Sequence, residues 1–299
     1  MSGARSPAPV RLSAFLEVLL RAVRPRQWSK NVLVVAAPCA AGAIARPQVA
    51  ERVAVAFVVF CLLSSATYLF NDVRDAERDR AHPRKRLRPV ASGELSERAA
   101  LLTGGALAMM GVALAGAVGL ALATVGVAYL AVTAGYSLWW RGVVVLDIVA
   151  IAAGFVLRAV AGGAAGDVYL SRSFLLVAAF GATFLVVGKR HAELRDTATD
   201  SSARSTLRRY STGSLRLLLA CSALGALVAY GLWAFTGQGS GVWHVLSIVP
   251  FTLWLARYAT LVDEGAGQSP EGVIVGDRPL VALTVIWGVL FVSGVYAGH

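Results

Sequence analysis

Charged side chains are scarce in this 299-residue sequence. Asp, Glu, Lys and Arg together make up 15% of it, while 57% is hydrophobic and the mean hydropathy is +0.66. This composition excludes an ordinary soluble domain, in which about a quarter of the residues carry charge. A hydrocarbon core about 30 Å thick needs about 20 mostly apolar residues per crossing helix. The sequence therefore predicts an all-α, polytopic integral membrane protein.

Cysteine is also rare. Cys39, Cys61 and Cys221 all fall in apolar stretches without metal-ligand spacing, which argues against a thiolate metal centre. The 17 acidic residues are outnumbered by 28 basic ones, for a net charge of +11. No known nucleic-acid module interrupts the apolar stretches. Anionic headgroups or a phosphorylated substrate therefore explain the positive charge better than a nucleic acid does.

Long apolar runs dominate the rest of the chain and give about nine candidate spans. The first and the sixth are short, and we expect them to borrow flanking residues. The nine ranges are approximately 32–45, 50–70, 99–119, 120–138, 143–163, 174–188, 215–235, 242–261 and 280–297.

The basic residues gather before the first span and after spans two, four, six and eight. Because Lys and Arg accumulate in short cytoplasmic segments, these segments and the N-terminus are predicted to be cytoplasmic, with His299 outside. A multi-pass protein of the plasma (inner) membrane is expected.

Two parts are expected along the chain. Residues 1–30 form an N-terminal arm with an interfacial amphipathic helix, and residues 31–299 form one transmembrane catalytic domain. Within that domain, segments of about 71–98 and 189–214 cap the cytoplasmic side. The apolar positions of the arm repeat at helical spacing at Leu12, Phe15, Leu16, Leu19 and Val23.

A cluster of carboxylates, "NDVRDAERD" at 71–79, follows the second span. Asp72, Asp75 and Asp79 are three and four residues apart, so a helix places them on one face. Converging carboxylates repel one another unless a cation lies between them. Mg²⁺ prefers oxygen ligands and binds through a few carboxylates together with substrate phosphate oxygens, so a magnesium site is predicted.

A simpler interpretation is a solvated loop in which Asp75 and Asp79 form ion pairs with the neighbouring Arg74, Arg78 or Arg80. The metal interpretation is favoured because carboxylates at a membrane boundary are costly without a function. The cations that follow at 84–88 suit a magnesium-bound polyphosphate, although positive-inside topology alone also accounts for them.

A second polar segment, "GKRHAELRD" at 188–196, ends the sixth span. Lys189, Glu193 and Asp196 share one helical face, and this segment is expected to face the aspartates across one cavity. An ordinary Lys189–Glu193 helix pair is the alternative.

Charges also occur inside the fifth span. Asp147 and Arg158 are eleven residues apart, about 16 Å along one helical face, and are expected to line a cavity without touching. Arg158 either contacts an acceptor phosphate or braces a neighbouring helix.

The pattern Asn71-Asp72-x-x-Asp75-x-x-x-Asp79, followed by a basic loop, resembles the UbiA superfamily of intramembrane prenyltransferases. "RPRQWSKN" at 24–31 and "YSLWWRGVVVLDI" at 136–148 extend the resemblance over nearly the whole chain. The resemblance implies a UbiA-like helical bundle with an active-site cavity on the cytoplasmic side.

The segment after span six departs from the commoner family pattern, a second Asp-x-x-x-Asp motif, and reads Lys189-Arg190-His191-Ala192-Glu193. With "RPRQWSKN" and "DIVAIAAGFVLRAVAGG", it resembles the branch of decaprenyl-phosphate phosphoribosyltransferases. That resemblance implies 5-phosphoribosyl 1-diphosphate (PRPP) as donor, a polyprenyl phosphate such as decaprenyl phosphate as acceptor, and a lipid-linked phosphoribose for cell-wall arabinogalactan as product.

The resemblance also implies residue roles. Asp72, Asp75 and Asp79 are the expected catalytic residues and ligands of the Mg²⁺ cofactor on the diphosphate, and Asn71 orients them. The candidates for substrate contacts are Lys30, Lys85, Lys189 and Arg190 for phosphate oxygens, Tyr136 and Glu193 for ribose or the metal shell, and Arg158 for the acceptor. The expected partners are both substrates and the lipid bilayer, and a homo-oligomer is compatible with the sequence.

Two other functions stay open at this point. An aromatic prenyltransferase of quinone biosynthesis has the same fold and first motif but uses prenyl diphosphate. A membrane transporter of a phosphorylated solute moves its substrate without chemical change, and it explains poorly why acidic and basic clusters share one membrane face. A CDP-alcohol phosphotransferase is disfavoured because the Asp-Gly and Ala-Arg elements of its signature are missing around the cluster.

Overall fold

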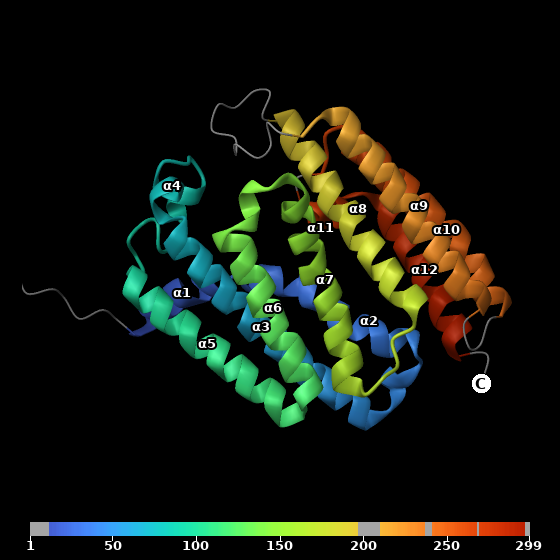
Figure 1. Ribbon diagram of the computed structural model, residues 1–299, viewed down its shortest axis with the longest axis horizontal. Helices are drawn as coiled ribbons and strands as arrows, with labels where there is room; N and C mark the ends of the chain where they lie inside the picture. The colour runs from blue at the N-terminus through green and yellow to red at the C-terminus, as the bar shows by residue number, and fades with distance from the viewer. Residues whose placement is uncertain (1–11, 197–209, 237–240, 268, 297–299) are drawn as a thin grey trace, which may run out of the picture.

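The protein is all-helical in the computed structural model, which describes residues 12–196, 210–236, 241–267 and 269–296 (Figure 1). No β-strand occurs in these ranges. The helices are α1 (Leu12–Val23), η1 (Pro25–Val32), α2 (Leu33–Ala40), η2 (Ala43–Ala45), α3 (Pro47–Arg74), α4 (Ala76–Arg80), η3 (Lys85–Leu87), α5 (Glu97–Val118), α6 (Leu120–Leu138), η4 (Trp140–Gly142), α7 (Val144–Gly166), α8 (Arg172–Asp196), α9 (Thr212–Thr236), α10 (Val242–Asp263), α11 (Pro270–Gly276) and α12 (Arg278–Tyr296).

Eight of the described helices are long and apolar enough to cross a membrane, namely α3, α5, α6, α7, α8, α9, α10 and α12. The prediction of a polytopic helical membrane protein is confirmed, and the short sixth span is lengthened at both ends in the 25-residue α8.

The first expected span, 32–45, is different. It is replaced by the eight-residue α2, about 12 Å long, which contains Pro38 and is followed by Gly42 at a φ of 64°. Pro38 lies inside α2, and the helix ends at Ala40, ahead of Gly42 in the left-handed region, so the apolar stretch does not form one long helix.

The long helices alternate in direction, so alternate connections meet at the same end of the bundle. The end of α3, the α6–α7 turn, the end of α8 and the α10–α12 connection all lie in the upper half of Figure 1. We call this end the basic face and define it by residues 71–96, 139–143, 189–196 and 264–277. The alternation of basic loops in the sequence thus corresponds to one end of the folded bundle.

The N-terminal α1 lies in the segment where the interfacial helix of the arm is predicted. Its Leu19 and Val23 pack against a cluster that includes the buried Leu69 and Leu95, while Leu16 remains 50% exposed. The helix is thereby fixed to α3 and leaves part of its apolar surface uncovered, as an interfacial helix requires.

Two segments that are far apart in sequence meet at the junction of α2 and α7. A Cβ atom on Gly162 would lie only 1.7 Å from the carbonyl oxygen of Val34, so the two backbones touch there. One helical turn before Gly162, the buried Arg158 donates hydrogen bonds to the side-chain oxygen of Asn31 at 2.8 Å and to the Tyr129 hydroxyl at 3.0 Å. Small residues allow such an approach, which ties the start of the chain to the core.

The Gly162→Ala variant is therefore expected to be strongly destabilised, by about 1–3 kcal/mol or more, because the added methyl group meets backbone that cannot rotate away. The measurement is the unfolding midpoint of purified protein in detergent. Gly105→Ala on α5 is the matched control, since a Cβ there meets nothing within 4 Å. Equal midpoints for both variants would contradict the close approach.

Candidate functional site

The aspartate motif lies where α3 ends on the basic face. Helix α3 stops at Arg74, Asp75 adopts φ −93° and ψ 1°, and the short α4 follows. Asp72 and Asp79 are each 2% exposed. The expected continuous helix is therefore interrupted at Asp75, although the Asp75 and Asp79 amides still donate to the carbonyl oxygens four residues earlier, at 2.9 and 2.8 Å.

Asp72 and Asp79 share one guanidinium group. Arg88 contacts Asp79 at 2.5 Å and Asp72 at 3.3 Å, and Arg24 forms a second ion pair with Asp72. Arg24 has a positive φ of 54° at the turn between α1 and η1, a conformation that is uncommon for a residue with a side chain. The two buried carboxylates thus gather cations from segments before and after them.

Asp75 contacts a different set of cations. Its carboxylate accepts from Arg141 of η4 at 2.8 Å and pairs with Arg78 at 2.7 Å. Within the described residues, no three His, Cys, Asp or Glu side chains lie close enough together to hold a metal ion. The ion-pair interpretation is correct for Asp75 and Arg78, but the other arginine partners come from distant segments.

The α6–α7 turn connects the aspartates to a second polar group. Ser137, near the end of α6, donates to the side-chain oxygen of Asn71. The neighbouring Tyr136 donates through its hydroxyl to Asp147 of α7 at 3.1 Å. The end of α6 therefore contacts Asn71 of α3 through Ser137 and Asp147 of α7 through Tyr136.

The second polar group is built on a buried ion pair between α7 and α8. Arg190 binds both carboxylate oxygens of Asp147, at 2.6 and 2.9 Å, and both side chains are 3% exposed. Arg190 also contacts Glu193 at 2.5 Å, and Lys189 lies 4.0 Å from the same carboxylate. The ordinary Lys189–Glu193 helix pair is thus present, while Arg190 is locked by Asp147 rather than directed at solvent.

The remaining predicted residues lie in three places. Lys30 of η1 forms an ion pair with Glu271 of α11 at 2.9 Å. Lys85 begins η3 in the loop behind the aspartates. Arg158 is buried in the bundle on Asn31 and Tyr129, so it braces neighbouring helices, and no contact joins it to Asp147. Of the expected cap at 189–214, residues 197–209 lie outside the described residues.

Taken together, two polar groups share the basic face. The aspartate group consists of Arg24, Asp72, Asp75, Asp79, Arg88 and Arg141. The arginine group consists of Tyr136, Asp147, Lys189, Arg190 and Glu193. Helix α7 packs against both α3 and α8 and lies between α6 and α8 in Figure 1. The end of α6 joins the two groups through Ser137 and Tyr136.

Sequence reasoning assigned no role to Arg24, Arg141, Ser137 or Glu271. Arg24 and Ser137 lie inside the motifs "RPRQWSKN" and "YSLWWRGVVVLDI", so these motifs could have identified both residues as candidates. Nothing in the sequence marked Glu271, because its contact with Lys30 spans most of the chain.

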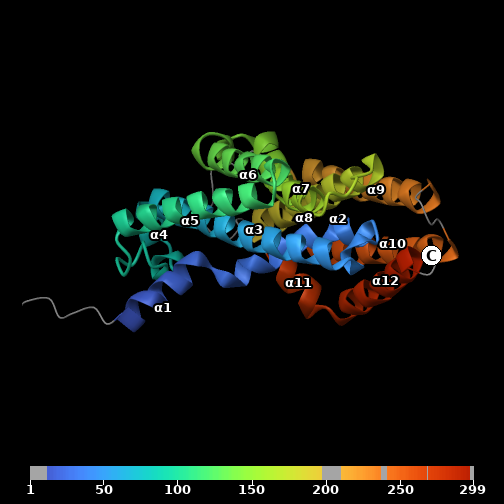
Figure 2. The same ribbon diagram turned by 90° about the horizontal axis from the view of Figure 1, so that it is seen from below.

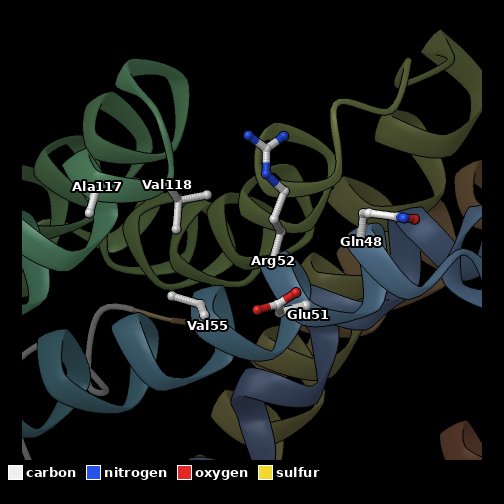
Figure 3. Close-up of a pocket in the computed structure, with 6 residues that line it drawn as sticks. All are labelled: Gln48, Glu51, Arg52, Val55, Ala117 and Val118. Atoms are coloured by element: carbon white, nitrogen blue, oxygen red, sulfur yellow. The ribbon is translucent and has the colours of Figure 1, made fainter.

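Two hollows can be compared with this site. One of about 300 Å³ lies between the start of α3 and the end of α5, lined among others by Glu51, Arg52 and Val118 (Figure 3). It is at the opposite end of α3 from Asp72. The other, of about 380 Å³, lies on the basic face beside the turn into α11 and is lined by Gly265, Ser269 and Val273 among others. Neither is lined by the aspartates.

Comparison with protein families identifies the family to which this helical bundle belongs. The family model described as UbiA prenyltransferase family matches residues 32–274, which is most of the chain. The chain belongs to the UbiA prenyltransferase family. The aspartate motif and both polar groups lie within or beside the matched range.

Curated relatives of this UbiA-family chain include three named decaprenyl-phosphate phosphoribosyltransferase. The protein of Corynebacterium glutamicum is 43% identical, over 93% of this chain and 86% of its own length. That of Mycolicibacterium smegmatis is 42% identical over 90% and 89%. That of Mycobacterium tuberculosis is 42% identical over 90% and 91%.

Solved structures support the fold independently. A UbiA homologue from Archaeoglobus fulgidus, bound to GPP and Mg²⁺, superimposes with a TM-score of 0.72 at 16% identity, covering 94% of this chain and 99% of that one. The same homologue bound to DMAPP and Mg²⁺ gives a TM-score of 0.72. At this identity the likeness establishes the fold alone, and it confirms the expected UbiA-like bundle.

Proposed function

We propose that this UbiA-family protein transfers a 5-phosphoribosyl group from PRPP to decaprenyl phosphate or a similar polyprenyl phosphate and releases diphosphate. The observation that carries the proposal is 42–43% identity, over about nine tenths of each chain, to three proteins named for this activity. The product is a lipid-linked phosphoribose, which fits a role in cell-wall arabinogalactan synthesis. The arrangement of cations around buried carboxylates supports a polyanionic donor.

The aspartate group fits a divalent cation held together with substrate. The Oδ2 atom of Asp72 is buried and has no hydrogen-bond partner. Burying a carboxylate oxygen in this way costs free energy unless a bound cation interacts with it. Mg²⁺ commonly binds through one or two carboxylates plus phosphate oxygens and waters, so a compact set of three protein ligands is not required. Asp72 is the first candidate ligand, with Asp79 and Asp75 beside it.

A bound Mg²⁺ supplies charge neutralisation of the diphosphate as the bond to ribose breaks. Arg24 and Arg88 are held at the same place by Asp72 and Asp79 and are partly exposed, with 26% and 30% of their side chains accessible. Planar guanidinium groups bind phosphate oxygens well, so both are placed to bind the leaving diphosphate. These arginines extend the earlier set of phosphate contacts, Lys30, Lys85, Lys189 and Arg190.

The transfer itself needs no dedicated general base. A phosphate monoester has a second pKa of about 6, so the lipid phosphate is already an anionic nucleophile at neutral pH. Its oxygen forms the new bond to C1 of the ribose, while the C1–O bond to diphosphate breaks and the bonding electrons leave with the diphosphate. The role of the protein is to orient both substrates and stabilise the charge on the leaving group.

The basic face is placed in the cytoplasm under this proposal, in the plasma membrane, with α1 on the same side and the end of α12 outside. The support is the concentration of Lys and Arg at one end of the bundle. A donor made in the cytoplasm then reaches both polar groups from water, and the lipid acceptor reaches them from the bilayer.

The test is an assay of purified protein with Mg²⁺, decaprenyl phosphate and radiolabelled PRPP, run beside the same protein with labelled prenyl diphosphate and a quinone precursor. A labelled transfer product is expected only from PRPP, as lipid-linked phosphoribose, and chelation of the metal should abolish it. Transfer from prenyl diphosphate alone would overturn the proposal in favour of an aromatic prenyltransferase.

A further inference from the structure

Glu271 lies on the basic face, but it is not among the site residues that the sequence predicted. It is the second residue of α11, whose first turn is capped by Ser269, with the Ser269 hydroxyl accepting from the Gly272 amide at 3.3 Å. Its carboxylate forms an ion pair with Lys30 at 2.9 Å. In Figure 2, α11 lies beside the segment that leads from α1 towards α3. A short helix from the end of the chain thus carries an acid to a predicted phosphate ligand.

The turn that leads to Glu271 packs against the part of α8 that carries the second predicted phosphate ligand, Lys189. The turn into α11 packs on α8: a Cβ atom on Gly267 would lie 2.9 Å from the Ala192 Cβ and 3.1 Å from the Gly188 carbonyl oxygen, which places this turn beside Lys189. Burial acts to raise the pKa of Glu271, but the charge and hydrogen bond of Lys30 and the charge of Lys189 bring that pKa below its ordinary value. Glu271 is therefore an ionised carboxylate influenced by both lysines.

An ionised carboxylate beside two lysines weakens any site that binds only phosphate, because it repels the anion that the lysines attract. It strengthens a site whose ligand offers neutral hydroxyl donors next to its anionic groups. PRPP has this pattern, since the ribose diol lies between the 5-phosphate and the 1-diphosphate. A prenyl diphosphate has no hydroxyl group to offer.

We propose that Glu271 is a substrate-binding residue that accepts hydrogen bonds from the ribose hydroxyls of the donor while Lys30 and Lys189 meet its phosphate groups. This inference rests on the proposed function and adds a residue that selects a pentosyl donor over a prenyl donor. In the absence of substrate, the Lys30–Glu271 ion pair keeps the carboxylate charged and directed at the lysine.

The experiment is isothermal titration calorimetry on the full-length protein in detergent with Mg²⁺, using PRPP and inorganic diphosphate as separate ligands. Glu271→Gln keeps the size of the side chain and removes its charge, and Glu271→Ala removes both oxygens. Glu264→Gln is the matched control, because Glu264 is an exposed acid in the same connection. Unfolding midpoints of all variants are recorded so that a folding defect is recognised.

For Glu271→Gln, PRPP binding is expected to weaken about tenfold, the contribution of one charge-assisted hydrogen bond. Diphosphate binding is expected to stay the same or to tighten, since a negative charge has been removed. Glu271→Ala should weaken PRPP binding more strongly, again without weakening diphosphate binding. Glu264→Gln should change the binding of neither ligand.

Three results would overturn the inference. Equal weakening of both ligands would mean that Glu271 only holds Lys30 in place. Tighter binding of both would mean that it competes with substrate, and unchanged PRPP binding would mean that it does not contact the ribose. If the unsubstituted protein binds diphosphate but not PRPP, the proposed function itself fails, and this result is distinguishable from the other three.

Discussion

Asp72→Asn is expected to lower the rate of transfer by about 10²- to 10³-fold while the protein stays folded. Among the described residues, Asp72 is the one aspartate that has a buried oxygen without a partner, so the substitution removes the charge of the best candidate ligand for a divalent cation. Its partners Arg24 and Arg88 are partly exposed, so water solvates them when the carboxylate is lost. The measurement is transfer of labelled phosphoribose at saturating Mg²⁺, with the unfolding midpoint recorded alongside.

The matched control for Asp72→Asn is Glu77→Gln. Glu77 is an exposed acid on α4, two residues from Asp79, and its loss changes the net charge of the segment equally. Its transfer rate is expected to stay within twofold of the unsubstituted protein. An Asp72→Asn protein that keeps more than half of its activity over a range of Mg²⁺ concentrations would exclude Asp72 as a metal ligand.

Asp147→Asn is expected to have the largest effect on stability, lowering the free energy of unfolding by about 3–5 kcal/mol. The Arg190 side chain is 3% exposed, so the neutral asparagine leaves a guanidinium charge buried in the bundle with only Glu193 as a charged partner. Denaturant unfolding in detergent measures the loss. Glu97→Gln is the control, because Glu97 pairs with Arg80, their side chains are 54% and 51% exposed, and such surface pairs contribute about 0–1 kcal/mol.

The paired variant Asp147→Leu with Arg190→Met separates stability from function. Replacing both charges with apolar groups is expected to restore most of the lost stability, as for other buried ion pairs. Activity should not return, because Tyr136 and Glu193 each lose the partner that orients them. A stable and fully active double variant would mean that the arginine group plays no part in transfer.

The membrane architecture was predictable because it depends on composition and length. Apolar runs of about 20 residues found each of the eight long helices, and the placement of Lys and Arg predicted which connections share an end. The error was local. Residues 32–45 are as apolar as a span, but α2 ends at Ala40, ahead of the left-handed Gly42, and hydropathy does not measure backbone geometry.

The site was predictable only in part. The motifs identified Asp72, Asp79 and Arg190, and the structure places all of them on one end of the bundle. Asp75 contacts Arg141 and Arg78, whereas Asp72 and Asp79 share Arg88. Spacing along the helix does not specify which cation each carboxylate contacts.

The sequence alone determined that this chain is a helical membrane protein, that its carboxylates and cations concentrate at one end, and that it resembles the UbiA superfamily. These properties depend on amino-acid composition, on the spacing of apolar and charged residues and on local motifs, all of which are features of the sequence before it folds. Only the tertiary structure decided which cation meets which acid: Arg24 and Arg88 on Asp72, Arg190 on Asp147, and Lys30 on Glu271. Each of these pairs joins different helices or loops, so the packing of those elements sets their separation and no local pattern contains it.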